Sequence, residues 1–415
     1  MTKMDAGDVT SSPNWETLES FVRLEAQHFI QRVLEEEVAE FLGRKKSERR
    51  TTAEGNEGYR NGYGKPRRLS LSVGTVAVRR PRVRGVDEPF ESKVLPLFKR
   101  QSKELQALLP ELYLHGLALR DFDLAMRGLL GDGAPLSPAT MVRLKSQWAV
   151  EYDAWKRRDL AALEVVYLWG DGIYVKAGLE DAKAALLVLI GACSDGSKVV
   201  LAVESGHRES TESWSGVLRD LKARGLRAPK LTAGDGGLGL WAALRGVYPE
   251  SAEQRCWNHK MVNVLDQLPK KLQEKGKAAL QKIWHAEHVA DAEQWQQEFR
   301  KTFGAPYPKA VEILEKDWPM LTAYYAFPKE HWKHLRTTNI IESPFAAVRL
   351  RTSAAKRFKR VDHATAMIWR LLLVAEKTFR RLNAPELCAD VYRGTPYADG
   401  VRLNTEEPNR KRVAA

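Results

Sequence analysis

Apolar and polar positions recur with two different periods along the chain. Residues 1–50 carry apolar side chains such as Phe21, Leu24 and Val38 at helical spacing, which predicts an N-terminal helix. Over residues 59–85 the sequence alternates apolar and polar residues on both sides of a central glycine. This alternation predicts a small two-stranded unit with arginines projecting from it.

A helical period returns over residues 102–150. A Gly/Pro turn separates two short predicted helices there, and the second begins at Ser137 with Pro138 in its first position. This spacing fits a helix-turn-helix, and a plain helical hairpin fits it equally well.

Strand patterns begin after Glu164. Three apolar runs precede a helix, a fourth strand that ends at Asp235 and a short fifth strand near Cys256. Three consecutive strands followed by alternating helix and strand predict a mixed α/β sheet covered by helices. The three runs are residues 165–171, 184–193 and 197–206.

Residues 258–331 contain no convincing strand and predict amphipathic helices inserted into the α/β pattern. A last long helix is expected from Asp362 to about Arg381, and the tail after Pro385 is expected to be poorly ordered. The predicted domains are a basic N-terminal DNA-binding region (1–95), a helical, helix-turn-helix-like DNA-binding region (96–155), the first part of the α/β core (156–264), an all-helical insertion (265–331), the second part of the core (332–385) and a C-terminal tail (386–415).

Length and charge sharpen this picture. A chain of 415 residues predicts two or three domains. Its formal net charge of +13 attracts polyanions or acidic membrane surfaces. Residues 44–84 hold thirteen basic and three acidic residues. Arginines clustered on a strand pair with few apolar residues are typical of a surface that neutralises phosphates. The alternative interpretation is a charged hairpin that is only solvated. The predicted DNA contacts in this region are Arg60, Arg67, Arg68, Arg80 and Arg82.

The three cysteines, Cys193, Cys256 and Cys388, are too few and too scattered for a disulfide framework, which predicts a reducing compartment. No apolar run approaches the roughly 20 residues that span a bilayer, and the first residues lack a signal-peptide pattern. We therefore expect a cytoplasmic protein without a membrane partner.

Two aspartates follow apolar runs of the predicted sheet. Asp171 ends the first predicted strand, Asp235 ends the fourth, and glycine flanks both. Either one alone is more often a turn-capping residue. Because ligand-binding groups collect at strand ends in open α/β sheets, we expect both carboxylates to converge at one site.

Glu342 stands between two isoleucines and a run of arginines. Asn339 followed three residues later by Glu342 fits a capping box, whereas Ser343 and Pro344 fit an alternative helix start. Either way the acid lies at a helix N-terminus. A third carboxylate opposite the two aspartates would complete an all-oxygen site for two Mg²⁺ or Mn²⁺ ions, about 3.5–4 Å apart, that serve phosphoryl displacement.

Basic residues surround Glu342 in the sequence. Positions 349, 356 and 360 would share one face of a helix by their spacing. Few acidic residues stand near them in the sequence to pair with their charges. We expect these cations to neutralise the phosphates of DNA. The predicted contacts here are Arg336, Arg349, Arg351, Lys356 and Arg360, with Arg357 and Lys359 beside them.

The order of several motifs resembles the Mutator-type transposases of bacterial insertion sequences, which are Asp-Asp-Glu enzymes with a ribonuclease H-like core. The resemblance extends from about Tyr59 to Arg380. The motifs are YRNGYGKPRR with VRRPRVRG, GDGIYVK, ESWSGVLRDLKARGL, AGDGGLGL, QRCWNHK and LRTTNIIESPFAAVRLRT.

This resemblance implies that Asp171, Asp235 and Glu342 are the catalytic acids and metal ligands. The interval of 342 − 235 = 107 residues fits a helical domain inserted before the last acid. It also implies a homodimer, because two element ends must be handled together. The expected activity is metal-dependent cleavage of double-stranded DNA at terminal inverted repeats, followed by strand transfer into target DNA. The alternatives are a nuclease that only hydrolyses and a DNA-binding regulator without catalysis.

Cys256 and His259 correspond to a Cys-x-x-His motif of that family. Zinc bound together with His285 and His288 is one interpretation. We favour the other, in which both residues pack beside Asp235 and shape the site.

Overall fold

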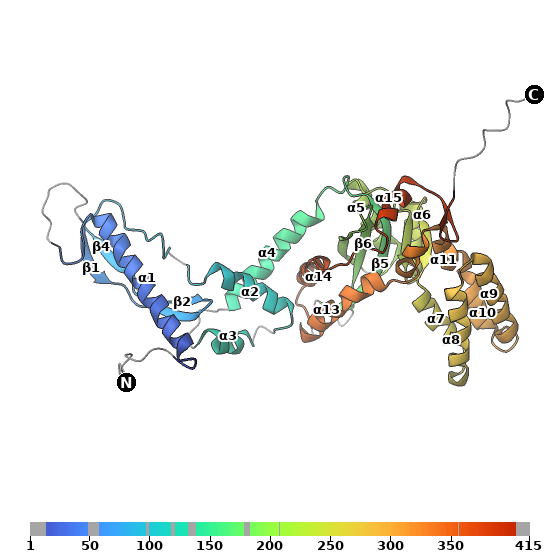
Figure 1. Cartoon of the computed structure of the whole chain (residues 1–415), viewed down its shortest axis with the longest axis horizontal. Coiled ribbons are helices and arrows are strands. Elements are labelled where there is room, and N and C mark those ends of the chain that lie inside the picture. Colours follow the sequence, from blue (N-terminus) through green and yellow to red (C-terminus); the bar gives the residue numbers. More distant parts are fainter. Residues whose placement is uncertain are drawn as a thin grey trace, which may run out of the picture. The chain divides into compact units, whose positions relative to one another are not determined.

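The computed structural model describes residues 14–48, 58–96, 99–117, 121–131, 138–177, 183–206, 208–355 and 357–403 (Figure 1). The chain divides into two compact units, Met1–Leu144 and Lys145–Ala415. No helix among the described residues is both long and apolar enough to cross a membrane.

The N-terminal unit combines one long helix with four short strands. Helix α1 (Leu18–Leu42) packs its buried Leu34 against the β2–β3 pair. The single two-stranded unit expected here is wrong, because the ribbon forms two separate antiparallel pairs, β1 with β4 and β2 with β3. The strands are β1 (Tyr59–Tyr63), β2 (Arg67–Leu71), β3 (Gly74–Val78) and β4 (Pro81–Arg84).

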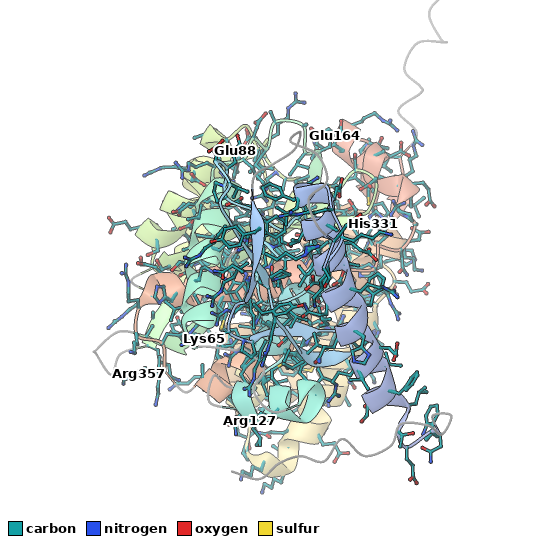
Figure 2. The ribbon with its side chains drawn as sticks, turned by 90° about the vertical axis from the view of Figure 1, so that its left-hand side faces the viewer. Lys65, Glu88, Arg127, Glu164, His331 and Arg357 are labelled. Atoms are coloured by element: carbon teal, nitrogen blue, oxygen red, sulfur yellow. The ribbon has the colours of Figure 1, made fainter. Side chains whose placement is uncertain are left out.

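The helical pattern predicted for residues 102–150 is confirmed, but the second helix after the Gly/Pro turn is not short: the helices are α2 (Lys103–Leu114), α3 (Phe122–Leu130) and the 19-residue α4 (Pro138–Lys156). The expected cap Ser137 lies outside the described residues, and the helix-turn-helix remains a prediction. Figure 2 draws the side chains of the described residues, with Lys65 and Arg127 labelled in this unit.

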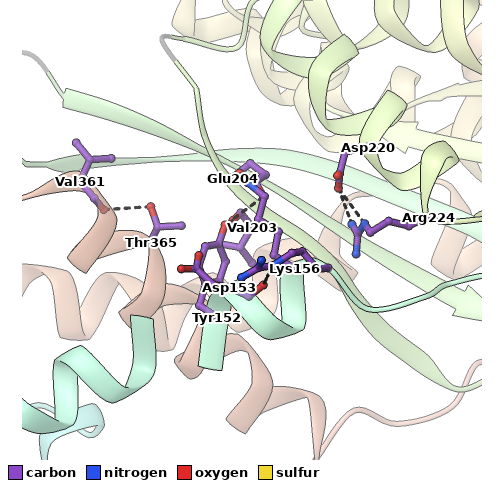
Figure 3. A network of polar contacts seen from close by, with 10 residues as sticks. Tyr152, Asp153, Lys156, Val203, Glu204, Asp220, Arg224, Val361 and Thr365 are labelled. Atoms are coloured by element: carbon purple, nitrogen blue, oxygen red, sulfur yellow. Dashed lines mark hydrogen bonds and ion pairs between the residues drawn. The ribbon is translucent and has the colours of Figure 1, made fainter. Parts of the chain in front are cut away.

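The last turns of α4 are fixed to the sheet of the second unit. The Tyr152 hydroxyl donates hydrogen bonds to the Val203 carbonyl (2.7 Å) and to Glu204 Oε1 (3.1 Å). Lys156 Nζ donates to Glu204 Oε2 at 2.7 Å. This network (Figure 3) connects α4 to strand β7 (Lys198–Gly206).

The second unit is built on a five-stranded mixed sheet of order β7-β6-β5-β8-β9. Strands β5, β6 and β7 are antiparallel neighbours, whereas β8 and β9 run parallel to β5. Helices α5 and α6 cover one face and bury Trp214 and Leu244 against Leu168 and Leu187. The α/β class is confirmed. The bounds are β5 (Val165–Lys176), β6 (Lys183–Cys193), β8 (Leu231–Gly234), β9 (Ala252–Arg255), α5 (Thr211–Ala223) and α6 (Leu238–Val247).

Strand β5 does not end at Asp171, and that prediction is wrong. Pairing with β6 continues through Asp171↔Val188 to Lys176↔Lys183, while pairing with β8 stops at Gly170↔Gly234. Asp171 therefore lies in the middle of β5, at the point where the neighbouring β8 ends.

A group of helices interrupts the sheet domain after β9, as predicted. Residues 258–331 are described throughout and contain no strand. Helices α7 to α10 lie side by side in this group (Figure 1). The elements are α7 (Trp257–Leu265), α8 (Lys270–His285), α9 (Val289–Phe303), α10 (Pro308–Lys316), α11 (Trp318–Thr322), η1 (Ala323–Ala326), η2 (Lys329–His331) and α12 (Trp332–Leu335).

The C-terminal helices return to the sheet. Helix α13 (Asn339–Ala355) packs against β5 and β6, and α14 (Val361–Glu376) packs against β7. The expected poorly ordered tail is wrong as far as Arg402, because α15 (Glu386–Arg393) buries Cys388 and Val391, and β10 (Tyr397–Ala398) pairs with β11 (Val401–Arg402).

Candidate active site

Two aspartates lie at the same edge of the central sheet. Asp171 comes one residue after the last β5–β8 pair, Gly170↔Gly234, and Asp235 directly follows β8. Because β5 and β8 run parallel, both carboxylates emerge at the carboxyl end of β8. The structure thus brings together the two predicted aspartates.

Asp171 experiences strong electrostatic effects in this position. Burial and the neighbouring Asp235 carboxylate raise the pKa of Asp171 to about 7, and Glu209 adds to the rise. The Gly172 N–H, 2.8 Å from Asp171 Oδ1, and the His259 imidazole both oppose it. Burial and a second acid therefore both disfavour the charged form of Asp171.

Glu209 is a fourth acid of this site, and sequence reasoning missed it. A Cβ atom at Gly172 would lie only 2.3 Å from Glu209 Oε1, and one at Gly237 would lie 3.6 Å from Oε2. Burial raises the pKa of Glu209, and Asp235 adds to this effect, whereas a hydrogen bond with Tyr174 lowers it. An acid in a connecting loop carries no sequence signal that distinguishes it from a solvated one.

Glu342 lies in the first turn of α13, as predicted, but its cap differs. Thr338, not Asn339, precedes the helix: its carbonyl accepts from the Glu342 N–H at 3.0 Å. The Thr338 hydroxyl donates to Glu342 Oε1 at 2.5 Å. Pro344 lies inside α13, so the helix start expected there is wrong. Thr338 thus orients the Glu342 carboxylate.

Hydrogen bonds fix the segment before α13 against the sheet. The Trp169 indole of β5 donates to the His334 carbonyl at 3.2 Å, and the Trp257 N–H donates to the Arg336 carbonyl at 2.9 Å. Side chains alternate between faces along a strand, so Asp171 lies on the same face of β5 as Trp169. The Asp171 carboxylate therefore faces the segment that leads to Glu342.

Cys256 and His259 lie beside Glu342. His259 Nδ1 is 3.8 Å from Glu342 Oε1, and the Thr338 N–H donates to Cys256 Sγ at 3.4 Å. The neighbouring Cys256 sulfur raises the pKa of His259 to about 9, and Glu342 and Asp235 add to the rise although burial opposes it. His259 is therefore an imidazolium at neutral pH and offsets part of the acidic charge.

His285 and His288 do not join Cys256, and the four-ligand zinc site with them is wrong. The His285 ring stacks on Trp284 at 5.7 Å, and His288 Nδ1 lies 3.6 Å from Asp399 Oδ2. Both histidines are exposed, whereas Cys256 is fully buried.

The predicted DNA contacts of the N-terminal ribbon fall into two groups. Arg68 and Arg82 are exposed. Arg67 and Arg80 are half-buried and donate to the carbonyls of Lys99 and Phe90, respectively. Arg60 is also half-buried. Among the described residues, Arg67 and Arg80 would therefore lose a hydrogen bond on turning to phosphate, whereas the exposed Arg68 and Arg82 are better placed to reach it.

The arginines around α13 are similarly divided. Arg336 donates to the Trp284 carbonyl and lies 5.3 Å above the Tyr324 ring, and Arg351 is only 3% exposed. The remaining described cations predicted here are exposed: Arg349, Arg357, Lys359 and Arg360.

The helical face expected for positions 349, 356 and 360 is not formed. Helix α13 ends at Ala355, and Arg360 is the residue before α14, where it pairs with Asp362 at 2.6 Å. Lys356 lies outside the described residues.

The fold and the site define a mixed α/β protein with an acidic cluster at the edge of its sheet. A model of the Mutator family of transposases matches residues 4–381. The chain belongs to this family and is a transposase of the insertion-sequence type, which confirms the resemblance in its motifs.

Curated relatives match over most of their length. The chain is 46% identical over 296 residues to the transposase for insertion sequence element IS6120 of Mycolicibacterium smegmatis, covering 71% of this chain and 92% of that protein. It is 44% identical over 293 residues to the transposase for IST2 of Acidithiobacillus ferrooxidans, covering 70% and 99%. A transposase for ISRM5 of Rhizobium meliloti is 29% identical over 358 residues, covering 85% and 87%.

Proposed function

We propose that this transposase binds the terminal inverted repeats of its insertion sequence and catalyses metal-dependent DNA strand cleavage and strand transfer. The observation that carries the proposal is the convergence of acids from distant segments at one sheet edge, with Asp171 and Asp235 on adjoining strands and Glu342 on the helix that packs against them. Structural carboxylates are usually dispersed or paired with cations, whereas burial and the neighbouring Asp235 raise the pKa of Asp171.

The donor set fits hard divalent cations. Asp171, Asp235 and Glu342 offer carboxylate oxygens, which Mg²⁺ and Mn²⁺ prefer. Burial and the neighbouring Asp235 raise the pKa of Asp171, whereas a bound divalent cation would favour the charged form of this carboxyl. We infer that these three residues hold the ions, which are two by the family pattern. Bound there, Mg²⁺ would activate the attacking oxygen and stabilise the leaving one.

The residues of the chain supply position and charge. The Gly172 and Gly237 N–H groups hold Asp171 and Asp235 at 2.8 and 3.0 Å. Thr338 orients Glu342 by its hydroxyl. The glycines beside the aspartates let other side chains approach closely, because a Cβ atom at Gly172 would meet Glu209 and one at Gly236 would meet Arg255.

The strand arrangement supports a ribonuclease H-like core. Three antiparallel strands followed by two parallel ones, in the order β7-β6-β5-β8-β9, place two acids on adjoining central strands. The all-helical segment between β9 and α13 fits an insertion before the third acid. A homodimer that holds two DNA ends is part of the same proposal.

A strand-transfer assay tests the function. The protein is incubated with Mg²⁺, a supercoiled target plasmid and a labelled element end that already carries a 3′-hydroxyl. We expect label joined to the plasmid, and no joining from an otherwise identical end that terminates in a 3′-deoxynucleotide. Asp171→Asn should lose at least about 100-fold of joining, since metal-bound charge stabilisation contributes several kcal/mol, while retaining DNA binding.

Two other results would favour the alternatives. Cleavage of uncut element ends without any joined product would indicate a nuclease that only hydrolyses. Specific binding of the ends without cleavage or joining, in Mg²⁺ and in Mn²⁺, would indicate a DNA-binding regulator.

A further inference from the structure

We propose that Cys256, His259 and Glu342 form a binding site for a soft divalent cation such as Zn²⁺, in addition to the hard-cation site of the carboxylates. One ligand atom from each of the three residues lies within 4.8 Å of the others. The inference shares Glu342 with the proposed function, but it concerns a different donor set and a different class of metal.

Two helix starts deliver the three donors. Cys256 lies between β9 and α7, and His259 follows in the first turn of α7. The Lys260 N–H donates to the Cys256 carbonyl at 3.0 Å, so the cysteine and the histidine belong to one rigid helix start. Glu342 comes from the first turn of α13, with Oε1 3.8 Å from His259 Nδ1.

The sulfur atom already receives a backbone hydrogen bond of the kind that supports a metal-bound thiolate. The Thr338 N–H donates to Cys256 Sγ at 3.4 Å, and the Thr338 hydroxyl, which donates to Glu342, lies 3.3 Å from the same sulfur. Burial alone would raise the pKa of Cys256, but His259 and Thr338 outweigh it and lower the pKa. Such donors orient a ligand and stabilise its charged form in metal sites.

The histidine has a nitrogen atom to offer. His259 Nδ1 is buried, yet within the part of the chain that the structure describes it has no hydrogen-bond partner. A buried polar atom without a partner carries a cost that a bound ligand would remove. A metal ion held between this nitrogen, Cys256 Sγ and Glu342 Oε1, which lies 3.8 Å away, would satisfy it.

The donor chemistry selects the class of cation. Thiolate and imidazole favour Zn²⁺ or Co²⁺ over Mg²⁺, which prefers oxygen alone. Binding would form Zn–S, Zn–N and Zn–O bonds and release to solvent any proton still held by the thiol or imidazole, without a redox change. Three protein donors leave a fourth position for water. Because Glu342 belongs to both donor sets, the two cations would compete for its carboxylate.

Cobalt spectroscopy on the full chain tests this site without DNA. Reduced, metal-free protein is titrated with Co²⁺ in excess Mg²⁺. We expect one equivalent to bind and to give a near-ultraviolet thiolate-to-cobalt charge-transfer band, which Zn²⁺ then removes. Cys256→Ser should abolish the band, and His259→Ala should weaken Co²⁺ binding at least about 10-fold. Cys193→Ser and Cys388→Ser, which alter the other two buried cysteines, are the matched controls and should keep the band.

A wild-type protein without the band, or a Cys256→Ser variant that keeps it, would overturn the proposal. If Cys256→Ser does not fold, His259→Ala decides, because a side chain that is 43% exposed should be removable without loss of the fold. Unchanged Co²⁺ affinity in that variant would also overturn the site. A failed titration leaves the strand-transfer assay unaffected, so the two proposals fail separately.

Discussion

At the scale of single residues, the acids differ in how far the sequence could identify them. Asp171, Asp235 and Glu342 were found because each stands beside an element boundary or inside a motif. Glu209 was not found, because its proximity to Gly172 arises only from the folding of the β7–α5 connection against β5. For the same reason, the spacing of Cys256 and His259 did not reveal that Glu342 is their neighbour.

The raised pKa of Asp171 predicts a pH-dependent effect of Asp171→Asn on metal-free stability. Asp171 titrates near 4 when unfolded and at about 7 when folded. Between these values the folded state binds more protons, so this group lowers stability as the pH rises from about 4 to about 7. Asparagine cannot ionise, and the variant should therefore gain stability relative to wild type at pH 8 but not at pH 4.

Melting curves in a chelator at the two pH values measure this difference. Three pKa units at about 1.4 kcal/mol each set an upper bound of about 4 kcal/mol, which solvent screening at a partly exposed carboxyl reduces. An equal effect of the substitution at both pH values would show that folding does not raise the pKa of Asp171.

Glu342→Gln separates capping from catalysis. The glutamine carbonyl can still accept from the Thr338 hydroxyl, so the loss of stability should be at most a fraction of the roughly 0.5–2 kcal/mol of a cap. Cleavage and strand transfer should both fall at least about 100-fold, because the variant lacks one charge of the metal-binding carboxylates. A melting curve and a cleavage gel on one preparation give the comparison. A variant that melts normally and still cuts would limit Glu342 to the helix cap.

At the scale of elements, periodicity located the strands and helices but not all their ends. The apolar run of β5 stops before Asp171, yet the strand continues because Ile173 and Val175 alternate into the interior, with exposures of 5% and 3%. Pro344 suggested a helix start, but the fully buried Phe345 and Val348 hold α13 together across it. In both places tertiary packing overrides the local signal.

The two strand pairs of the N-terminal unit, which carry the exposed arginines, lead to a prediction about DNA binding. Arg68→Ala with Arg82→Ala removes two exposed cations and should weaken binding and reduce the salt slope by about 0.9 per lost phosphate contact. Arg67→Ala with Arg80→Ala instead removes hydrogen bonds to the Lys99 and Phe90 carbonyls, and should mainly destabilise the N-terminal unit.

Binding isotherms at several salt concentrations, with melting curves for both double variants, distinguish these effects. The Arg67/Arg80 variant is the matched control, because it removes the same formal charge from the same ribbon. Identical salt slopes for wild type and the Arg68/Arg82 variant would locate the DNA elsewhere.

At the scale of the whole molecule, the three candidate catalytic acids come from segments that are far apart in the sequence, but all three lie within one of the two compact units. Asp171, Asp235 and Glu342 all belong to Lys145–Ala415, whereas the basic ribbon belongs to Met1–Leu144. The sequence predicts this separation of charge. It does not predict that the C-terminal unit begins within α4, because the helical periodicity continues without a break there. The contacts of Tyr152 and Lys156 with β7 are tertiary and leave no pattern in the sequence.

This division predicts how Mg²⁺ changes thermal unfolding. A ligand that binds only the folded carboxylate cluster stabilises the unit that contains it, by about 2.7 kcal/mol at 100 times its dissociation constant. Calorimetry of the full chain should therefore show two transitions, of which Mg²⁺ raises only that of the C-terminal unit. In Asp171→Asn this shift should disappear, while the transition of the N-terminal unit stays unchanged. If Mg²⁺ raised both transitions equally in the variant and in wild type, the ion would be acting through general screening of charge, and the three carboxylates would lose their assignment as its ligands.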